Sequence, residues 1–194
     1  MEDFTSIKIE RISGKKGEKK FKVSNPTTYQ LVGKGGQGVV FKLNEQQCVK
    51  IYEKKSTLEK EAYALNLGKE LSFIPKVYEI GSNYIIMDYI KGTDLKTYLK
   101  EKGSISENLT KQIITIAKEL ERVGFKRINL PLRHLIITEN NQIKVIDHVN
   151  SMNYKAPVPT DLIKGLKKLK QLDIFMKQVN QLDSKIYEKW TKFC

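Results

Sequence analysis

Four glycines crowd into residues 33–38 (GKGGQG), and the residues after them restrict the fold more than any other part of the sequence. Residues 39–43 favour a β-strand, residues 44–47 are turn-prone, and residues 48–52 resume the β pattern. This order predicts a strand, a glycine loop and further strands. It excludes a dinucleotide-binding βαβ unit, in which a helix must follow the glycines. A Walker A loop is excluded as well, because no Gly-Lys-Ser/Thr closes the motif.

Glycines in such a hairpin suit a phosphate-binding loop. Backbone without Cβ atoms can approach phosphates closely and can adopt positive φ angles. An ordinary glycine-rich hairpin turn is the alternative interpretation.

The size of the chain sets further bounds. Its 194 residues (22.4 kDa) are enough for one or two lobes with a buried core. No apolar run approaches the ~20 residues of a membrane span, and the first residues lack the basic and apolar regions of a signal peptide. Two cysteines, Cys48 and Cys194, predict neither a disulfide framework nor a metal cluster. We therefore expect a cytoplasmic protein with no membrane partner.

The chain is strongly basic, with a net charge of +13 and a pI of about 9.5. Much of the charge lies in residues 8–22 and 164–170. Such a charge favours polyanionic partners, RNA or ribosomes included, or acidic protein substrates. A solvated lysine-rich surface is the alternative, since no aromatic-studded RNA-binding motif accompanies the lysines.

The element pattern divides the chain near residue 90. Residues 28–52 and 74–89 predict a five-stranded antiparallel sheet, which one helix at 57–71 accompanies. The later elements are expected to be helices at 93–99 and 106–123, a hairpin at 135–146, and helix from 161 to the end. We predict an α+β fold with three parts: a basic N-terminal extension (1–27), an N-terminal lobe (28–90) and a reduced, mainly helical C-terminal lobe (91–194).

With Lys50 on the second strand after the glycine loop, residues 28–150 resemble a protein kinase-like domain of the small bacterial kind, similar to RIO-type minimal kinases. The resemblance implies ATP and Mg²⁺ as ligands and a serine or threonine of an unknown protein as acceptor. Lys50 would orient the α- and β-phosphates and pair with a glutamate on the next helix. That glutamate is Glu61 or, in another register, Glu59. The other nucleotide contacts that the resemblance implies are Gly33, Gly35, Gly36, Gly38, Val40, Met87 and Tyr89.

Both members of this predicted pair have a plainer interpretation. Lys50 could be a surface lysine at a strand edge, and Glu61 an exposed helix residue.

The predicted catalytic loop departs from the family pattern H-R-D-x-x-x-x-N. Counted back from the following hairpin, Asn129 stands in the position of the catalytic aspartate and His134 in that of the metal-binding asparagine. The D-F-G triplet becomes residues 147–149, which keep the magnesium-binding aspartate as Asp147. The resemblance therefore implies catalytic positions at Asn129, Asp147 and Lys50, and metal positions at Asp147 and His134.

These departures change the expected chemistry. Asn129 cannot accept a proton, and loss of a general base lowers a rate by about 10²–10⁴. Phosphoryl transfer depends mainly on positioning and charge neutralisation, so slow transfer is still expected. His134 is a poor magnesium ligand because Mg²⁺ prefers oxygen, and it could contact phosphate or pack in the hairpin instead. Asp147 could be a turn aspartate after a buried strand.

Three hypotheses follow. The chain is an atypical minimal serine/threonine kinase, a pseudokinase that acts as a nucleotide-regulated switch or scaffold, or a basic RNA- or ribosome-associated module.

Overall fold

The computed structural model describes residues 3–13 and 19–194, which form two compact units. The first unit comprises Met1–Asn66 and Lys76–Tyr89, and the second comprises Leu67–Pro75 and Ile90–Cys194. Each unit is described by itself. Part of the first lysine-rich stretch, residues 14–18, lies outside the described residues.

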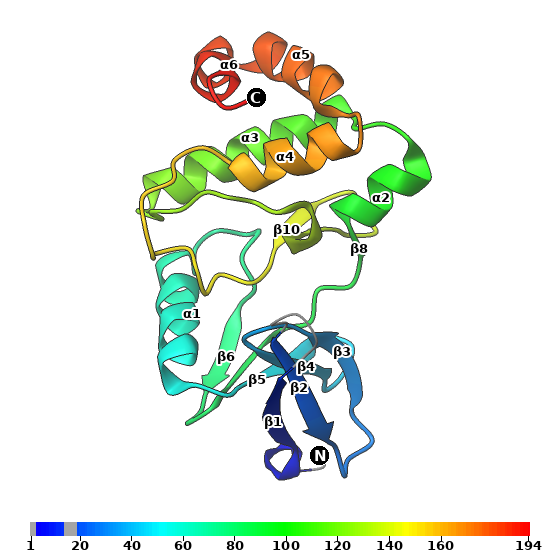
Figure 1. Cartoon of the computed structure of the whole chain (residues 1–194), viewed down its shortest axis with the longest axis vertical. Coiled ribbons are helices and arrows are strands. Elements are labelled where there is room, and N and C mark those ends of the chain that lie inside the picture. The colour runs from blue at the N-terminus through cyan, green and yellow to red at the C-terminus, as the bar shows by residue number, and fades with distance from the viewer. Residues whose placement is uncertain (1–2, 14–18) are drawn as a thin grey trace. The chain divides into compact units, whose positions relative to one another are not determined.

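The first unit is built on the five-stranded antiparallel sheet that the sequence predicts, in the order β3-β4-β5-β7-β6. A hairpin lies at each edge of the sheet (Figure 1). The first hairpin joins β3 to β4 around the glycine loop, and the second joins β6 to β7 around a turn at residues 81–83. The strands are β3 (Gln30–Lys34), β4 (Gly38–Lys42), β5 (Gln47–Tyr52), β6 (Val77–Ile80) and β7 (Tyr84–Asp88).

One face of this sheet is covered by the N-terminal segment. A short 3₁₀ turn, η1 (Phe4–Ser6), leads into a second antiparallel pair, β1 (Lys8–Ser13) and β2 (Lys19–Ser24). Phe21 of β2 is fully buried in a cluster with side chains of β4, β5 and β7. The cluster consists of Ile7, Phe21, Val39, Phe41, Val49, Ile51 and Ile86. The basic extension expected for residues 1–27 therefore contains a hairpin that contributes to the core of the first unit.

The opposite face of the sheet carries the residues assigned to nucleotide. Side chains alternate along a strand, so Val40, Lys50 and Ile85, which are paired across β4, β5 and β7, point away from the apolar cluster. Helix α1 (Lys55–Leu67) contributes the buried residues Leu58, Glu61, Ala64 and Leu65. It ends just before Gly68, four residues short of the predicted end at residue 71.

The second unit contains a small sheet and five of the helices. The sheet has the order β10-β9-β8, from β8 (Thr93–Asp94), β9 (Leu135–Ile137) and β10 (Ile143–Val145), and the 3₁₀ turn η3 (Leu132–His134) precedes β9. The helices are α2 (Leu95–Lys102), α3 (Glu107–Arg122), α4 (Thr160–Lys168), α5 (Leu172–Leu182) and α6 (Ser184–Thr191).

The core of the second unit forms around α3, whose buried side chains include Ile113, Ile116, Ala117 and Leu120. Helix α5 packs against α3, α4 and α6 (Figure 1). Two glutamines of the C-terminal half bond to the loop before α3 and to the first turns of α3 itself. Gln171 accepts from the N–H of Ile105 at 3.0 Å, and Gln178 accepts from the hydroxyl of Thr110 at 2.6 Å. These bonds fix the C-terminal helices on the rest of the unit.

The helical segment predicted from residue 161 onward is three helices. The first break falls at Lys170, whose φ of 56° is left-handed and cannot continue an α-helix. The second falls at Asp183, whose carboxylate caps α6 by accepting from the N–H of Ile186 at 2.9 Å.

Candidate functional site

The glycine loop is a tight hairpin in the first unit. The N–H of Gly35 donates to the carbonyl of Gly38 at 3.1 Å, and Gly33 lies opposite Val40 in the β3–β4 register. A Cβ on Gly38 would lie 2.4 Å from the carbonyl oxygen of Ile51, so packing against β5 already requires glycine there. A Cβ on Gly35 would meet no atom within 4 Å. The loop backbone at Gly35 and Gly36 is exposed, as a ligand-binding turn would need.

Lys50 and Glu61 form a buried ion pair in the first unit. Their side chains are 11% and 1% exposed, and Nζ of Lys50 lies 2.6 Å from Oε2 of Glu61. The hydroxyl of Tyr52 donates to the same carboxylate oxygen at 2.8 Å. Lys50 is therefore no surface lysine, Glu61 is no exposed helix residue, and the pairing with Glu61 rather than Glu59 is confirmed. Sequence reasoning missed Tyr52, although its position two residues after Lys50 places it on the same face of β5.

Met87 and Tyr89, two of the expected nucleotide contacts, lie at the end of β7. Met87 is buried and lies opposite Cys48 in the β5–β7 register. The N–H groups of Asp88 and Tyr89 donate to the carbonyls of Lys76 and Gln46 at 2.9 and 2.8 Å. A ligand could bind these two N–H groups only by displacing those carbonyls. The Tyr89 ring lies 5.2 Å from the ammonium of Lys42.

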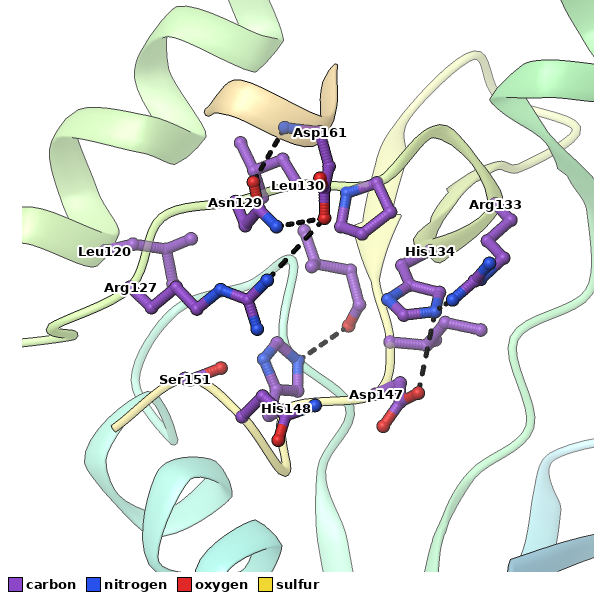
Figure 2. A pocket seen from close by; sticks show the side chains of 14 residues that line it. Leu120, Arg127, Asn129, Leu130, Arg133, His134, Asp147, His148, Ser151 and Asp161 are labelled. Carbon is purple, nitrogen blue, oxygen red and sulfur yellow. Dashed lines mark hydrogen bonds and ion pairs between the residues drawn. The ribbon is translucent and has the colours of Figure 1, made fainter. Parts of the chain in front are cut away.

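The second unit contains a polar pocket that brings together the predicted residues of the catalytic loop and the D-F-G position. Figure 2 shows Asn129, His134 and Asp147 on its lining, together with Arg127 and Asp161. Asp147 has a φ of 62° and Leu130 a φ of 45°. Non-glycine residues rarely adopt this region, and such strain gathers at functional sites.

Around Asp147, the contacts restrict what His134 can do. Nε2 of His134 lies 3.5 Å from Oδ2 of Asp147 and also accepts a hydrogen bond from Nε of Arg133 at 3.1 Å. One ring nitrogen cannot accept from Arg133 while carrying the proton that Asp147 would attract. The neighbouring His148 is buried and bonds locally, with Nε2 3.0 Å from the carbonyl of Val145.

Asn129 is buried, and both polar atoms of its side chain make hydrogen bonds. Its Oδ1 accepts from the hydroxyl of Thr160 at 3.0 Å and from the N–H of Asp161 at 2.7 Å, and its Nδ2 donates to the carboxylate of Asp161. Asn129 thus caps the start of α4, where the preceding Pro159 provides no side-chain cap.

Arg127 lies beside this cap. Its guanidinium is 3.6 Å from the carboxylate of Asp161 and stacks 5.0 Å from the centre of the Tyr154 ring. Its Nε is buried and has no hydrogen-bond partner in the described part of the chain. Sequence reasoning gave Arg127 no role, and it missed Asp161 as a pocket residue because Asp161 is distant in sequence and looks like an ordinary first-turn helix acid.

The donor set fits magnesium in part. Asp147 supplies a carboxylate, and Mg²⁺ at nucleotide sites uses one or two carboxylates together with phosphate oxygens and water. His134 offers nitrogen, which Mg²⁺ does not prefer. Residues 3–13 and 19–194 contain no cluster of three or more His, Cys, Asp or Glu side chains suited to a metal. Asp147 is therefore the residue that would hold magnesium, with phosphate completing the site.

Comparison with known proteins finds curated relatives over part of the chain, and no protein-family profile matches it. A Bacillus subtilis protein named "Putative serine/threonine-protein kinase YrzF" is 33% identical over 122 residues, 60% of this chain and 57% of the relative. Two larger proteins carry names that begin "Probable serine/threonine-protein kinase". The one from Clostridium perfringens is 30% identical over 160 residues, 70% of this chain and 23% of the relative. The one from Clostridium acetobutylicum is 31% identical over 137 residues, 60% of this chain and 21% of the relative.

The chain thus spans little more than half of the first relative and less than a quarter of the other two. No helix in the described residues is both long enough and apolar enough to cross a membrane. The described residues form an α+β fold with a five-stranded antiparallel sheet and six helices, which is compatible with a kinase-like fold. Fold and relatives together support a kinase-like protein.

Proposed function

We propose that the chain binds ATP with Mg²⁺ and transfers the γ-phosphate to a serine or threonine of a protein, as an atypical, minimal kinase similar to the RIO type. The observation that carries the proposal is the buried pair of Lys50 and Glu61 on the sheet face that continues from the glycine loop. Lys50 would contact the α- and β-phosphates, with Glu61 holding its ammonium in place. In the second unit, Asp147 would hold the metal.

A pseudokinase is the second candidate, and the surroundings of Asn129 favour it. The side-chain amide of Asn129 caps α4, and it cannot take the proton of a substrate hydroxyl. Such a protein would bind nucleotide and act as a switch or scaffold without transfer.

The role of Lys50 is tested by ATP binding in a variant that keeps the interior neutral. Replacing Lys50 alone would leave Glu61 charged and buried, which is destabilising by about 3–5 kcal/mol. We therefore expect the double variant Lys50→Met/Glu61→Gln to remain folded and to bind ATP at least about tenfold more weakly, a loss of about 1.4 kcal/mol. Isothermal titration calorimetry and a thermal melt measure the two quantities.

The matched control is Lys60→Met, which removes an exposed lysine next to Glu61 in α1. Its ATP affinity should equal that of the wild type. If the double variant binds ATP as tightly as the control does, Lys50 does not contact the phosphates.

A further inference from the structure

The pocket of the second unit contains a second carboxylate besides that of Asp147, that of Asp161. Its side chain is 43% exposed, although it belongs to the first turn of α4 beside the buried Asn129 (Figure 2). It accepts a hydrogen bond from Nδ2 of Asn129 and lies 3.6 Å from the guanidinium of Arg127. Oδ2 makes both contacts, and no described residue donates to Oδ1 of Asp161.

The hydrogen bonds of Asn129 explain why that position holds an amide. Its Oδ1 already accepts from Thr160 and from the backbone of Asp161, so its NH₂ group must face the Asp161 carboxylate. An aspartate at position 129 would place two carboxylates in contact, and two such charges do not readily ionise together. Asn129 is thus the side chain that a carboxylate at position 161 requires.

We propose that Asp161 is the residue that takes the proton from the acceptor hydroxyl, in the role that the family motif gives to residue 129. The inference rests on the proposed function. Asp161 lines the same pocket as Asp147, the residue expected to hold magnesium. Asn129 and Arg127 fix the carboxylate through Oδ2, which leaves Oδ1 to meet a substrate that enters the pocket.

The step balances without a further reactant. The hydroxyl oxygen of a serine or threonine forms a bond to the γ-phosphorus of ATP. The bond between that phosphorus and the oxygen bridging to the β-phosphate breaks, and its electron pair leaves with ADP. The hydroxyl proton moves to Asp161, which later returns it to water. General-base assistance of this kind accounts for about 10²–10⁴ in rate.

A purely structural role for Asp161 predicts different effects of mutation from those of a proton acceptor. Acidic residues in a first helical turn stabilise the helix, and the bond to Asn129 anchors α4. A structural residue would affect the melting temperature and ATP affinity together with the rate. A proton acceptor would affect the rate alone.

The experiment measures transfer from γ-labelled ATP to dephosphorylated casein and to the chain's own hydroxyls, with ATP affinity and melting temperature recorded for each variant. We expect Asp161→Asn to lower the transfer rate by at least about 10², with ATP affinity within about twofold of the wild type. The exchange variant Asn129→Asp/Asp161→Asn returns the carboxylate to position 129 beside an amide. It should recover at least about tenfold of the lost rate. The matched control Asp173→Asn removes the first-turn carboxylate of α5 and should leave the rate unchanged.

The outcomes separate this inference from the function on which it rests. If the wild type transfers phosphate and Asp161→Asn keeps its rate within about threefold, the inference is wrong and the kinase proposal stands. If the wild type binds ATP without any transfer, Asp161 is no proton acceptor and the pseudokinase is favoured. If the wild type does not bind ATP, the proposed function itself fails. Should Asp161→Asn not fold, Asp161→Ser can still accept the bond from Asn129 and decides the question in its place.

Discussion

Two opposite charges, Lys50 and Glu61, are withdrawn from water in the first unit. Desolvation of such a pair offsets much of its attraction, so a buried ion pair is weak evidence for stability. The hydroxyl of Tyr52 adds a third polar group to the same carboxylate. The burial of this pair is better explained by the proposed role of Lys50 in binding an anionic ligand than by a contribution to folding.

The burial of a single residue, Cys48, can also be tested. Burial, and then the charge of Asp88, raises the pKa of its thiol to about 12. Alkylation requires the thiolate, so at pH 8 iodoacetamide should label the exposed Cys194 and leave Cys48 unmodified until the chain unfolds. Mass spectrometry of native and denatured samples measures this. Equal labelling of the two cysteines in the native protein would mean that β5 does not bury Cys48.

The same pKa makes stability depend on pH in a definite direction. The thiol of Cys48 keeps its proton in the fold up to about pH 12, whereas an unfolded cysteine loses it near pH 8.5. Between these values the unfolded chain binds fewer protons. The contribution of Cys48 to stability is therefore complete below the lower value and falls by up to about 1.4 kcal/mol per pH unit above it.

At the scale of elements, the packing of the β1–β2 hairpin on the sheet of the first unit can be tested. Phe21 is 0% exposed in the apolar cluster, whereas Ile12 on β1 is 41% exposed. Phe21→Ala should lower the free energy of unfolding by about 3–5 kcal/mol. Ile12→Ala, the control on the neighbouring strand, should change it by no more than about 0.5 kcal/mol. Urea denaturation measures both, and equal small effects would show that the hairpin does not pack on the sheet.

The five-stranded sheet could be predicted because its strands are continuous β-favouring runs between clear turns. The β1–β2 hairpin was not predicted, although Phe21 and Val23 alternate with lysines in the way of a half-buried strand. The high lysine content of that segment hid the alternation. The break between α4 and α5 depends on the left-handed backbone at Lys170, and lysine itself gives no signal for that conformation.

In the candidate site, too, contacts between neighbouring elements could be predicted, whereas contacts between distant segments could not. The pairing of Lys50 with a glutamate of the next helix could be expected from the resemblance to kinases, with Glu61 or Glu59 as the partner, and Glu61 makes the contact. Asp161 could not be connected to Asn129, which lies 32 residues earlier. Only the fold of the second unit brings the start of α4 to the loop before η3. A sequence motif records a residue type at one position, whereas a functional group can be supplied from another element.

At the scale of the whole molecule, Lys50 belongs to the first unit and Asp147 to the second. The net charge of +13 favours an anionic ligand and an acidic acceptor. Asp147 gives the sharper test, since its left-handed φ of 62° is one that asparagine also tolerates. Asp147→Asn should therefore keep the backbone and remove the carboxylate.

Calorimetric titration with ATP, with and without Mg²⁺, tests the proposed nucleotide site and the proposed role of Asp147 in holding magnesium. The wild type and Asp147→Asn are compared. The account predicts that Mg²⁺ strengthens ATP binding to the wild type by at least about tenfold, about 1.4 kcal/mol, and that this strengthening disappears in the variant. A wild type that binds no ATP in either condition would contradict the nucleotide site. A magnesium effect that survives in Asp147→Asn would contradict the placement of the metal.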